Sequence, residues 1–590
     1  MDSEIQALLQ GPFAPRENEG PSKVTSLEEA LRRHVRPGMA LHIGVDARAA
    51  LCELARQWWG GHPRFTLVMS AVGDHALSLL HGGLVETMVA SIYADLYLPP
   101  GPSPIVQRAF KDGVRFENWS LYTHLQRLQA AALGLEFLPT RSLLGTTMAK
   151  ENASAFKEIA DPFGGEAPVG LVKALAPDLS LVHAWAADPA GNAIGIPADG
   201  DSYWGARAAR DGVIVTCERL VTTEFLRHHA SQVTIPGYRV RAVAQAPFGA
   251  HPRALMGNGL PDFQGYGEDL PFFLAQRQAW KEPASYEGWV KEWVLEPRSH
   301  AGYLARLGEE RLGRLRALAE PSGWRQAVEQ GLEAVRLDQG YSPTEMMVIA
   351  AARSIQELVR SHGLSTILTG IGTTSLASWL AYLLLQERGL SVDLVIGTGD
   401  FGYRPAPGYP GMYSYANVSS SKMLSSTVDV YGAVLSGRRS GCLGTLGAAQ
   451  VDPAGNLNST RLANGMYLVG AGGAPDIAAG AQEILVMAPL STRRYVEQVD
   501  YITVPGENTR HLVSDRGTFV KREGDQRFTL TALFPGPSES SLEEQVRTLR
   551  ENCGWRSLQV ADELSVLAAP TRQELGLLRL LDPEQAVLKG

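Results

Sequence analysis

Cysteine is scarce in this sequence, with four residues in a chain of 590. Cys52, Cys217, Cys442 and Cys553 lie far apart and form no CxxC pair, which argues against a zinc site or a disulfide framework. The sequence also has no HExxH motif. We therefore expect no metal site, and a reducing, cytoplasmic setting.

Long apolar runs and dense basic clusters are absent as well. The longest apolar stretch, residues 376–385, is half of the ~20 residues that a membrane-spanning helix requires. The first residues are acidic and lack the apolar segment of a secretory signal peptide. The net charge is −8, and no run of Lys and Arg could follow a phosphate backbone. The sequence predicts neither a membrane segment nor a nucleic-acid partner.

Two segments share one plan, an apolar strand, a glycine turn and then a helix with apolar residues at helical spacing. They are residues 39–58 and 365–384. The identical pentapeptide Asp-Pro-Ala-Gly-Asn follows each of them, at 188–192 and at 452–456. The shared order indicates an internal duplication, and the wider spacing in the first half indicates an insertion there.

The length and the alternation of strands and helices define the predicted fold. A chain of 590 residues with 45% hydrophobic residues exceeds the capacity of one core. Alternating elements predict an α/β fold with two homologous, open, mostly parallel sheets covered by helices. The predicted parts are a flexible arm at 1–22, a first domain at 23–261, a helical connector at 262–339 and a second domain at 340–590.

Five motifs of the second half occur in a fixed order. They are YSPTEMMVIAAAR (341–353), GIG (370–372), LGAAQVDPAGNLNST (446–460), VGAGGAPDIA (469–478) and VDYITVPG (499–506). In this order they resemble the β subunit of glutaconate CoA-transferase, of the class I coenzyme A transferase superfamily. The first half resembles the α subunit through residues 116–146, 181–195 and 243–252. The chain therefore resembles two such subunits fused in one polypeptide.

The resemblance implies an acyl-CoA site between the halves, with the glycine loop at 470–474 against the thioester. Glycines let backbone N–H groups approach a carbonyl oxygen that becomes negative during attack. The residues expected to bind CoA or substrate are Gly372, Thr398, Gly399, Gln450, Asn456, Gly470, Gly472, Gly473 and Ala474. For Gln450 and Asn456 the alternative is that their amides close a turn. The family also implies a homo-oligomer, and no cofactor beyond CoA itself.

One family feature is missing. Family transferases use a glutamate, in an E-S-G or S-E-N-G setting at the end of a β-subunit strand, to attack the thioester. The matching strand here is residues 392–405, where Gly397-Thr398-Gly399 aligns with E-S-G. Because glycine has no side chain to carry a covalent intermediate, Gly397 marks the position of a lost nucleophile.

Two other carboxylates are candidates for catalysis. Asp400 follows Gly397 closely, but along an unbroken strand its carboxylate would be displaced by about 10 Å. Glu117 lies in a region from which some superfamily hydrolases draw a catalytic acid, although an exposed acid before a helix is an equally good interpretation. His124, His183, His251 and Cys442 are further candidates, each with a structural alternative.

Three hypotheses for function follow. The leading one is an acyl-CoA-processing enzyme that catalyses hydrolysis, C–C cleavage or decarboxylation. The alternatives are a true CoA-transferase or acyltransferase with a relocated nucleophile, and a non-catalytic acyl-CoA-binding protein. The spacing of glycines at 397–402 is similar to a dinucleotide-binding motif, but Pro405 and Pro407 follow where the helix would run. We therefore expect no Rossmann cofactor site.

Overall fold

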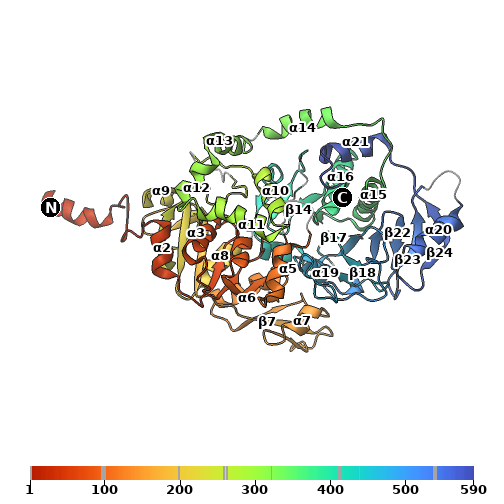
Figure 1. Ribbon diagram of the computed structural model, residues 1–590, viewed down its shortest axis with the longest axis horizontal. Helices are drawn as coiled ribbons and strands as arrows, with labels where there is room; N and C mark the ends of the chain where they lie inside the picture. Colours follow the sequence, from red (N-terminus) through yellow and green to blue (C-terminus); the bar gives the residue numbers. More distant parts are fainter. Residues whose placement is uncertain are drawn as a thin grey trace.

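The computed structural model describes residues 3–94, 101–196, 200–256, 260, 263–320, 322–408, 411, 414–437, 439–535 and 541–589. Each half of the chain builds one large β-sheet with helices packed against it (Figure 1). The two halves, red to yellow and teal to blue, lie side by side (Figure 1). The predicted α/β fold with two open sheets is confirmed.

The first sheet is mostly parallel. In spatial order its strands are β11 (Val233–Ile235), β9 (Ala193–Gly195), β8 (Leu179–Ala187), β1 (Ala40–Ile43), β2 (Phe65–Val68), β3 (Val85–Ala90) and β4 (Arg115–Asn118), and β10 (Val213–Leu220) lies between β8 and β12 (Val240–Gln245). Only the pairings that involve β9 are antiparallel. Leu41 of β1 lies opposite Leu67 and Leu179, and all three side chains are buried in the core.

The second sheet has a parallel centre and antiparallel flanks. Its spatial order is β16 (Met423–Leu424), β15 (Asp400–Tyr403), β14 (Asp393–Val395), β13 (Thr366–Leu368), β17 (Cys442–Gly447), β20 (Glu483–Met487), β21 (His511–Val513), β22 (Gly517–Val520), β23 (Thr529–Leu533) and β24 (Gln559–Val566). The five neighbouring central strands, β14, β13, β17, β20 and β21, pair in parallel. Their carboxyl ends therefore meet at one edge, where ligands of open α/β sheets bind.

Helices cover both sheets. In the first half they are α2 (Leu27–His34), α3 (Arg48–Trp58), α4 (Ala76–His81), α5 (Pro104–Lys111), α6 (Leu121–Ala132), α7 (Thr147–Glu151), α8 (Asp201–Ala208) and α9 (Thr223–His228). In the second half they are α15 (Pro343–His362), α16 (Thr373–Glu387), α17 (Tyr415–Val418), α18 (Thr427–Asp429), α19 (Ala474–Gly480), α20 (Leu542–Glu551) and α21 (Arg572–Leu581). The pairs β1–α3 and β13–α16 are the two strand–helix units predicted from the sequence.

Local signals set the limits of the longest helix, α15. Ser342 Oγ accepts a hydrogen bond from the Glu345 N–H (3.1 Å), and Glu345 Oε2 accepts one from the Ser342 N–H (2.8 Å). This capping box satisfies donors that have no partner within the helix. The helix ends at Gly363, whose φ of +61° suits glycine.

Between β12 and α15, the regular secondary structure of the described residues is helical, apart from one isolated bridge that pairs Leu255 with Tyr266. The helices are α10 (Leu270–Ala279), α11 (Pro283–Val290), a π-helical turn (Lys291–Leu295), α12 (His300–Leu307), α13 (Glu309–Ala317) and α14 (Gly323–Ala334). Figure 1 shows them in green, with α13 and α14 along the upper edge and α10 and α11 toward the middle. No helix within the described ranges combines the length and apolarity needed to cross a membrane.

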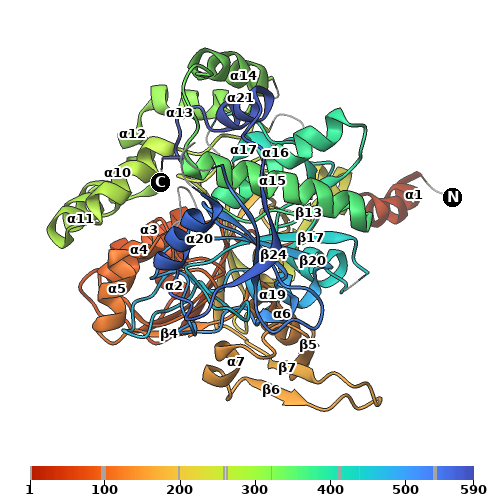
Figure 2. The same ribbon diagram turned by 90° about the vertical axis from the view of Figure 1, so that its right-hand side faces the viewer.

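Two smaller features extend from this body. The insertion in the first half forms a small sheet of β5 (Phe137–Thr140), β7 (Val169–Lys173) and β6 (Phe156–Ile159), which projects at the lower edge of Figure 2. At the N-terminus, α1 (Ser3–Gln10) stands away from the first half (Figure 1). Glu17 and Lys23 attach the following segment through backbone hydrogen bonds to Glu224 (3.0 Å) and Pro189 (2.7 Å).

The repeated pentapeptide forms the same turn twice. Asn192 donates its backbone N–H to Asp188 Oδ1 (2.9 Å) and its Nδ2–H to Oδ2 (2.9 Å). Asn456 makes the same two bonds to Asp452, at 2.9 and 2.8 Å. This agreement between two buried turns supports the internal duplication.

Each turn is tied to a Pro-Gly segment in the same way. Asn192 Oδ1 accepts a hydrogen bond from the Gly237 N–H (2.8 Å), and Asn456 Oδ1 accepts one from the Gly506 N–H (2.8 Å). A lysine then donates to the carbonyl oxygen of each glycine, Lys23 in the first half and Lys521 in the second. Both asparagine side-chain amides therefore make hydrogen bonds within the protein.

Replacing either asparagine should destabilise the fold. Asn192→Ala and Asn456→Ala each remove one N–H donor to a buried carboxylate and leave a glycine N–H without its acceptor, so we expect each to lower the free energy of unfolding by about 1–3 kcal/mol. Chemical denaturation of the two variants beside the wild type measures the effect. An Asn456 variant with unchanged stability but weakened ligand binding would contradict this interpretation.

Candidate active site between the two halves

The glycine loop of the second half is bound to the first half by its backbone. The Tyr93 N–H donates to the Val469 carbonyl (2.8 Å), and the Gly472 N–H donates to the Ser91 carbonyl (3.2 Å). Gly470 has a φ of +105°, and a Cβ atom there would overlap the Ser91 carbonyl oxygen. Glycine is required at this position by both the backbone conformation and the close approach.

Asp476 joins the same two segments through its side chain. Ser120 Oγ donates to Asp476 Oδ1 (2.6 Å), and the Tyr122 N–H donates to Oδ2 (3.1 Å). Burial raises the pKa of the Asp476 carboxyl to about 7. The sequence analysis did not select this residue, although an acid in the first turn of a helix, directly after a glycine loop, was a usable signal.

The segment around Gly397 is a hairpin and not one continuous strand. The Gly399 N–H donates to the Ile396 carbonyl (3.0 Å), and the Ile396 N–H donates to the Asp400 carbonyl (2.9 Å). Strands β14 and β15 on either side are antiparallel. The prediction of a single strand over residues 392–405 is therefore wrong, because Gly399, with a φ of +116°, reverses the chain.

The reversal changes the position of Asp400. Its carboxylate turns back toward the hairpin turn, where Thr398 Oγ1 donates to Asp400 Oδ2 (2.7 Å). Oδ1 is buried and has no hydrogen-bond partner among the described residues. Burial raises the pKa of the Asp400 carboxyl to about 6. The 10 Å displacement expected along an unbroken strand does not apply, because the strand is broken.

Tyr431 lies beside both the turn at Gly397 and the glycine loop at 470–474. It lies in a short π-helical segment (Val430–Val434), and its ring centroid is 6.5 Å from that of Tyr122. A Cβ atom added at Gly397 would overlap the Tyr431 hydroxyl oxygen, and so would one added at Gly473. The hydroxyl group therefore occupies the space beside both positions. No sequence spacing indicated this tyrosine.

The remaining predicted binding residues fall into two groups. Gly372 precedes α16 with a φ of +79°, and no atom lies within 4 Å of the position its Cβ would take. Ala474 is the first residue of α19. Gln450, by contrast, is hydrogen-bonded inside the protein at both ends of its amide, because Nε2 donates to Asp500 Oδ2 (3.0 Å) and Oε1 accepts from Asn458 Nδ2 (2.8 Å). For Gln450, as for Asn456, the geometry favours the turn-closing alternative.

Glu117 lies apart from this group. It is on strand β4, where its side chain is 30% exposed and pairs with Arg115 at 3.3 Å. Its backbone carbonyl accepts a hydrogen bond from the Tyr93 hydroxyl (2.9 Å). Among the interactions found for the described residues, none joins Glu117 to Gly397 or Tyr431. Asp400 and Asp476 are the carboxylates associated with the glycine elements.

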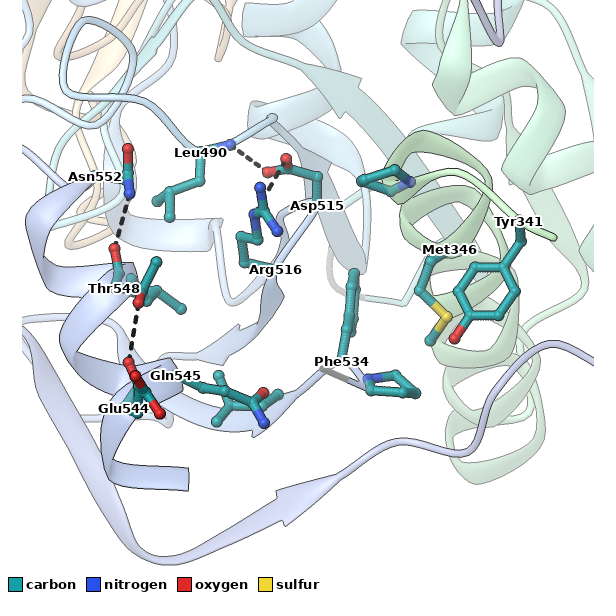
Figure 3. Close-up of a pocket in the computed structure, with 14 residues that line it drawn as sticks. Tyr341, Met346, Leu490, Asp515, Arg516, Phe534, Glu544, Gln545, Thr548 and Asn552 are labelled. Carbon is teal, nitrogen blue, oxygen red and sulfur yellow. Dashed lines mark hydrogen bonds and ion pairs between the residues drawn. The ribbon is translucent and has the colours of Figure 1, made fainter. Parts of the chain in front are cut away.

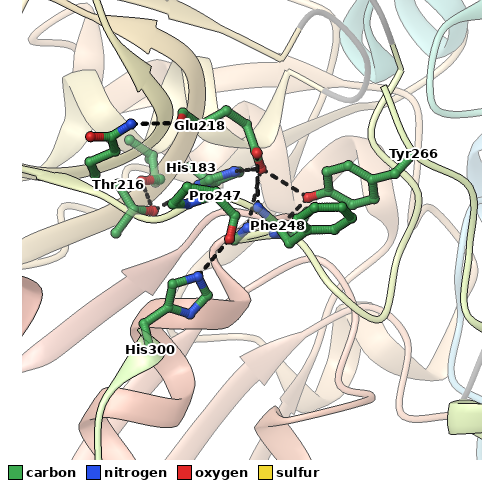
Figure 4. A network of polar contacts seen from close by, with 11 residues as sticks. His183, Thr216, Glu218, Pro247, Phe248, Tyr266 and His300 are labelled. Atoms are coloured by element: carbon green, nitrogen blue, oxygen red, sulfur yellow. Dashed lines mark hydrogen bonds and ion pairs between the residues drawn. The ribbon is translucent and has the colours of Figure 1, made fainter. Parts of the chain in front are cut away.

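The histidine candidates are interior residues. His183 hydrogen-bonds Thr216 Oγ1 and Glu218 Oε1, both at 2.9 Å, and Figure 4 shows Tyr266 directed at the same carboxylate. His251 lies between the Tyr303 hydroxyl (2.6 Å) and Asp269 (3.0 Å).

Burial also shifts the pKa values of the remaining two candidates, His124 and Cys442, away from neutral pH. Burial lowers the pKa of His124 to about 4 and raises the pKa of the Cys442 thiol to about 11. A neutral imidazole and a protonated thiol in the interior fit the structural alternatives.

A cavity of about 560 Å³ lies elsewhere in the second half. Figure 3 shows it between α15, α20 and the ends of the neighbouring strands. Its lining includes Tyr341, Met346, Leu490, Asp515, Arg516 and Phe534. None of the residues predicted to bind substrate is part of the lining.

Comparison with known proteins identifies the family. Residues 24–246 match the family model described as Coenzyme A transferase. One of the subunits of 3-oxoadipate CoA-transferase from Pseudomonas knackmussii is 31% identical over 269 residues, which cover 42% of this chain and 96% of its own length. The chain belongs to the coenzyme A transferase family. The family predicted from the sequence motifs is thus confirmed.

Two further comparisons extend this result. One of the subunits of glutaconate CoA-transferase from Acidaminococcus fermentans is 28% identical over 328 residues, covering 50% of this chain and 95% of its own length. The acyl-CoA transferase YdiF from Escherichia coli O157:H7 has a TM-score of 0.64 at 17% identity, covering 95% of this chain and 97% of that one. Both halves of this coenzyme A transferase family member therefore have the fold of a single-chain relative.

Replacing Gly470 should weaken the junction of the halves. Gly470→Ala places a methyl group against the Ser91 carbonyl at a positive φ, whereas Gly465→Ala has a similar φ of +82° but only a Phe110 ring carbon 3.7 Å away. We expect Gly465→Ala to cost about 1–2 kcal/mol of unfolding free energy and Gly470→Ala to cost more. Denaturation and amide exchange at Ile92 measure both effects, and equal costs would contradict the close approach.

Asp476 should make stability depend on pH. Because burial favours its neutral form, the folded protein keeps this proton to a higher pH than the unfolded chain does. Its stabilising contribution is complete below the ordinary pKa of 3.8 and is lost as pH rises to about 7. We expect the unfolding free energy of the wild type to fall over this range relative to Asp476→Asn, which does not titrate and whose amide oxygen can accept from the Tyr122 N–H while its Nδ2 donates to Ser120 Oγ. A constant difference across the range would show that Asp476 does not titrate in this way.

Proposed function

We propose that this protein is an acyl-CoA-processing enzyme that acts on the thioester without a covalent glutamyl intermediate. The proposed reaction is hydrolysis, C–C cleavage or decarboxylation. The observation that carries the proposal is the absence of a side chain at Gly397 together with the Tyr431 hydroxyl beside it. The names of the relatives, 3-oxoadipate and glutaconate CoA-transferase, support a CoA thioester as the substrate.

The arrangement supports a role for the glycine loop and for the turn at Gly397. The thioester would lie between the glycine loop and the turn at Gly397, where the two halves meet. Asp400 is an acid in that turn, and its buried carboxyl has a pKa of about 6 and is mostly ionised at neutral pH. Such a carboxylate is suited to take a proton from water or from an acidic C–H group. No cofactor beyond CoA is part of this proposal, and a homo-oligomer stays a prediction.

A second candidate function is favoured by the same residue. Because the hairpin returns Asp400 to the turn that contains Gly397, its carboxylate is a possible relocated nucleophile for a true CoA-transferase or acyltransferase. Glu117, on β4 and paired with Arg115, has no comparable support. Trapping of an enzyme-bound acyl or CoA species by borohydride or hydroxylamine would select this candidate.

Turnover of thioesters should be independent of an acceptor acid. We expect mass spectrometry of the protein with a panel of acyl-CoA thioesters, including unsaturated dicarboxyl-CoAs, to show free CoA, loss of CO2 or a cleaved acyl chain. The rate should be equal with and without acetate, because no glutamyl-CoA is formed. Acetyl-CoA that appears only with acetate would instead show a transferase, and binding without turnover would show a non-catalytic protein.

Asp400 should contribute to the chemical step. Asp400→Asn removes the proton acceptor and keeps the hydrogen bond from Thr398, so we expect kcat to fall by about 10²–10⁴-fold. Asp393→Asn is the matched control, because Asp393 begins the neighbouring strand and pairs with Lys422 at the surface. Equal rates for the two variants would remove Asp400 from the mechanism.

A further inference from the structure

The Tyr431 side chain fills space that a side chain at position 397 or 473 would otherwise occupy. Tyr431 is 7% exposed and packs in an apolar cluster that includes Val395 and Ile477. A Cβ atom at Gly397 would lie 2.9 Å from the ring carbon Cζ, in addition to overlapping the hydroxyl oxygen. A Cβ atom at Gly473 would also overlap the hydroxyl oxygen and the ring carbon Cζ. Glycine at both positions is therefore matched to the phenol beside them.

Three of the five amides in the glycine loop at 470–474 donate to protein carbonyls, and no acceptor for those of Ala471 and Gly473 is found among the described residues. The Gly470 N–H donates to the Ser459 carbonyl (3.1 Å), the Gly472 N–H to the Ser91 carbonyl (3.2 Å) and the Ala474 N–H to the Ala471 carbonyl (3.2 Å). These bonds fix the loop against the first half and within itself. The predicted role of the Gly472 amide as a donor to substrate therefore has no support in this arrangement.

A phenol can supply the hydrogen bond that these amides do not. Its O–H is both a donor and an acceptor, and it is held here beside Gly397 and Gly473 by close packing. A donor held in place in a partly dehydrated site stabilises developing charge more than one that must reorient. The position next to the lost nucleophile is where the carbonyl carbon of a bound thioester would lie.

We infer that Tyr431 is a catalytic residue whose hydroxyl donates a hydrogen bond to the thioester carbonyl oxygen of bound acyl-CoA. This inference rests on the proposed function. In hydrolysis, the oxygen of water bonds to the carbonyl carbon, its proton passes to Asp400, and the carbonyl electron pair moves to the oxygen held by Tyr431. Return of that pair breaks the C–S bond, and the CoA sulfur leaves and takes the proton.

The same donor serves the other two reactions. In decarboxylation, the bond from the α-carbon to the carboxylate carbon breaks, CO2 leaves, and the electron pair is delocalised onto the thioester oxygen. In C–C cleavage, Asp400 takes the proton of a hydroxyl group on the departing carbon, which leaves as a carbonyl compound, and the electron pair follows the same path. A proton from water or from Asp400 then adds to the α-carbon and restores the thioester. Because negative charge develops on the same oxygen in all three reactions, the role of Tyr431 does not depend on which one occurs.

Removing the hydroxyl oxygen tests this role. We expect Tyr431→Phe to lower kcat by about 10²–10³-fold, the usual effect of losing one oxyanion donor, with KM nearly unchanged. Tyr501→Phe is the matched control, because Tyr501 is a buried tyrosine whose hydroxyl donates to Glu151 Oε2 (2.9 Å) across the halves. It should lower stability and leave kcat unchanged. A Tyr431→Phe variant with wild-type kcat would overturn the inference.

A second pair of variants leaves the tyrosine intact. Gly397→Ala should displace the phenol and lower kcat, whereas Gly447→Ala should not, because no atom lies within 4 Å of its added methyl group. Infrared difference spectra of a bound ¹³C-labelled thioester provide a readout other than rate. The carbonyl stretch should be lowered in the wild type and restored in Tyr431→Phe, and equal stretches would overturn the inference.

These results separate the two proposals. Absence of thioester turnover by the wild type, with a carbonyl stretch that still depends on Tyr431, would refute the proposed function and retain the hydrogen bond. Normal turnover that is insensitive to Tyr431 would refute the inference alone. Failure of the wild type to bind any acyl-CoA would refute both.

Discussion

The close contact between the backbone at Gly470–Gly472 and the backbone at Ser91–Ile92 holds the two halves of this protein in register. At Gly470 a Cβ atom would overlap the Ser91 carbonyl, so the approach depends on glycine and on its positive φ. The hydrogen bonds between the segments then fix the loop in one position. Asp476 reinforces this contact, because its side chain accepts hydrogen bonds from Ser120 and Tyr122 of the first half.

A loop that is fixed in this way has consequences for chemistry. The Gly472 amide joins the halves and the Gly470 and Ala474 amides bond within the second half, so these three are not available to hold a developing negative charge. Tyr431 occupies the space beside Gly397 and Gly473, which places a polar group where a carboxylate side chain would otherwise project. Residues 397 and 431 are coupled by volume, since no side chain fits at Gly397 while the Tyr431 phenol is present.

The duplication shows which parts of the two halves diverged. The turns at Asp188–Asn192 and Asp452–Asn456 agree in their hydrogen bonds, and each is completed by a lysine from elsewhere in the chain. These turns are structural, so they tolerate little change. The segments after the second strand of each sheet differ more, and in the second half this segment became the hairpin at Gly397.

The sequence by itself determined the family, the two strand–helix units, the repeated turns and the absence of a side chain at Gly397. These properties reside in local patterns, because apolar periodicity, turn residues and motif order need no knowledge of distant contacts. The tertiary structure alone decided that Tyr431 lies beside Gly397 and Gly473, that the hairpin returns Asp400 to the turn, and that Asp476 bonds Ser120 from 356 residues away. Such contacts join residues that are far apart along the chain. Local sequence patterns therefore do not indicate which side chains meet or which hydrogen bonds form.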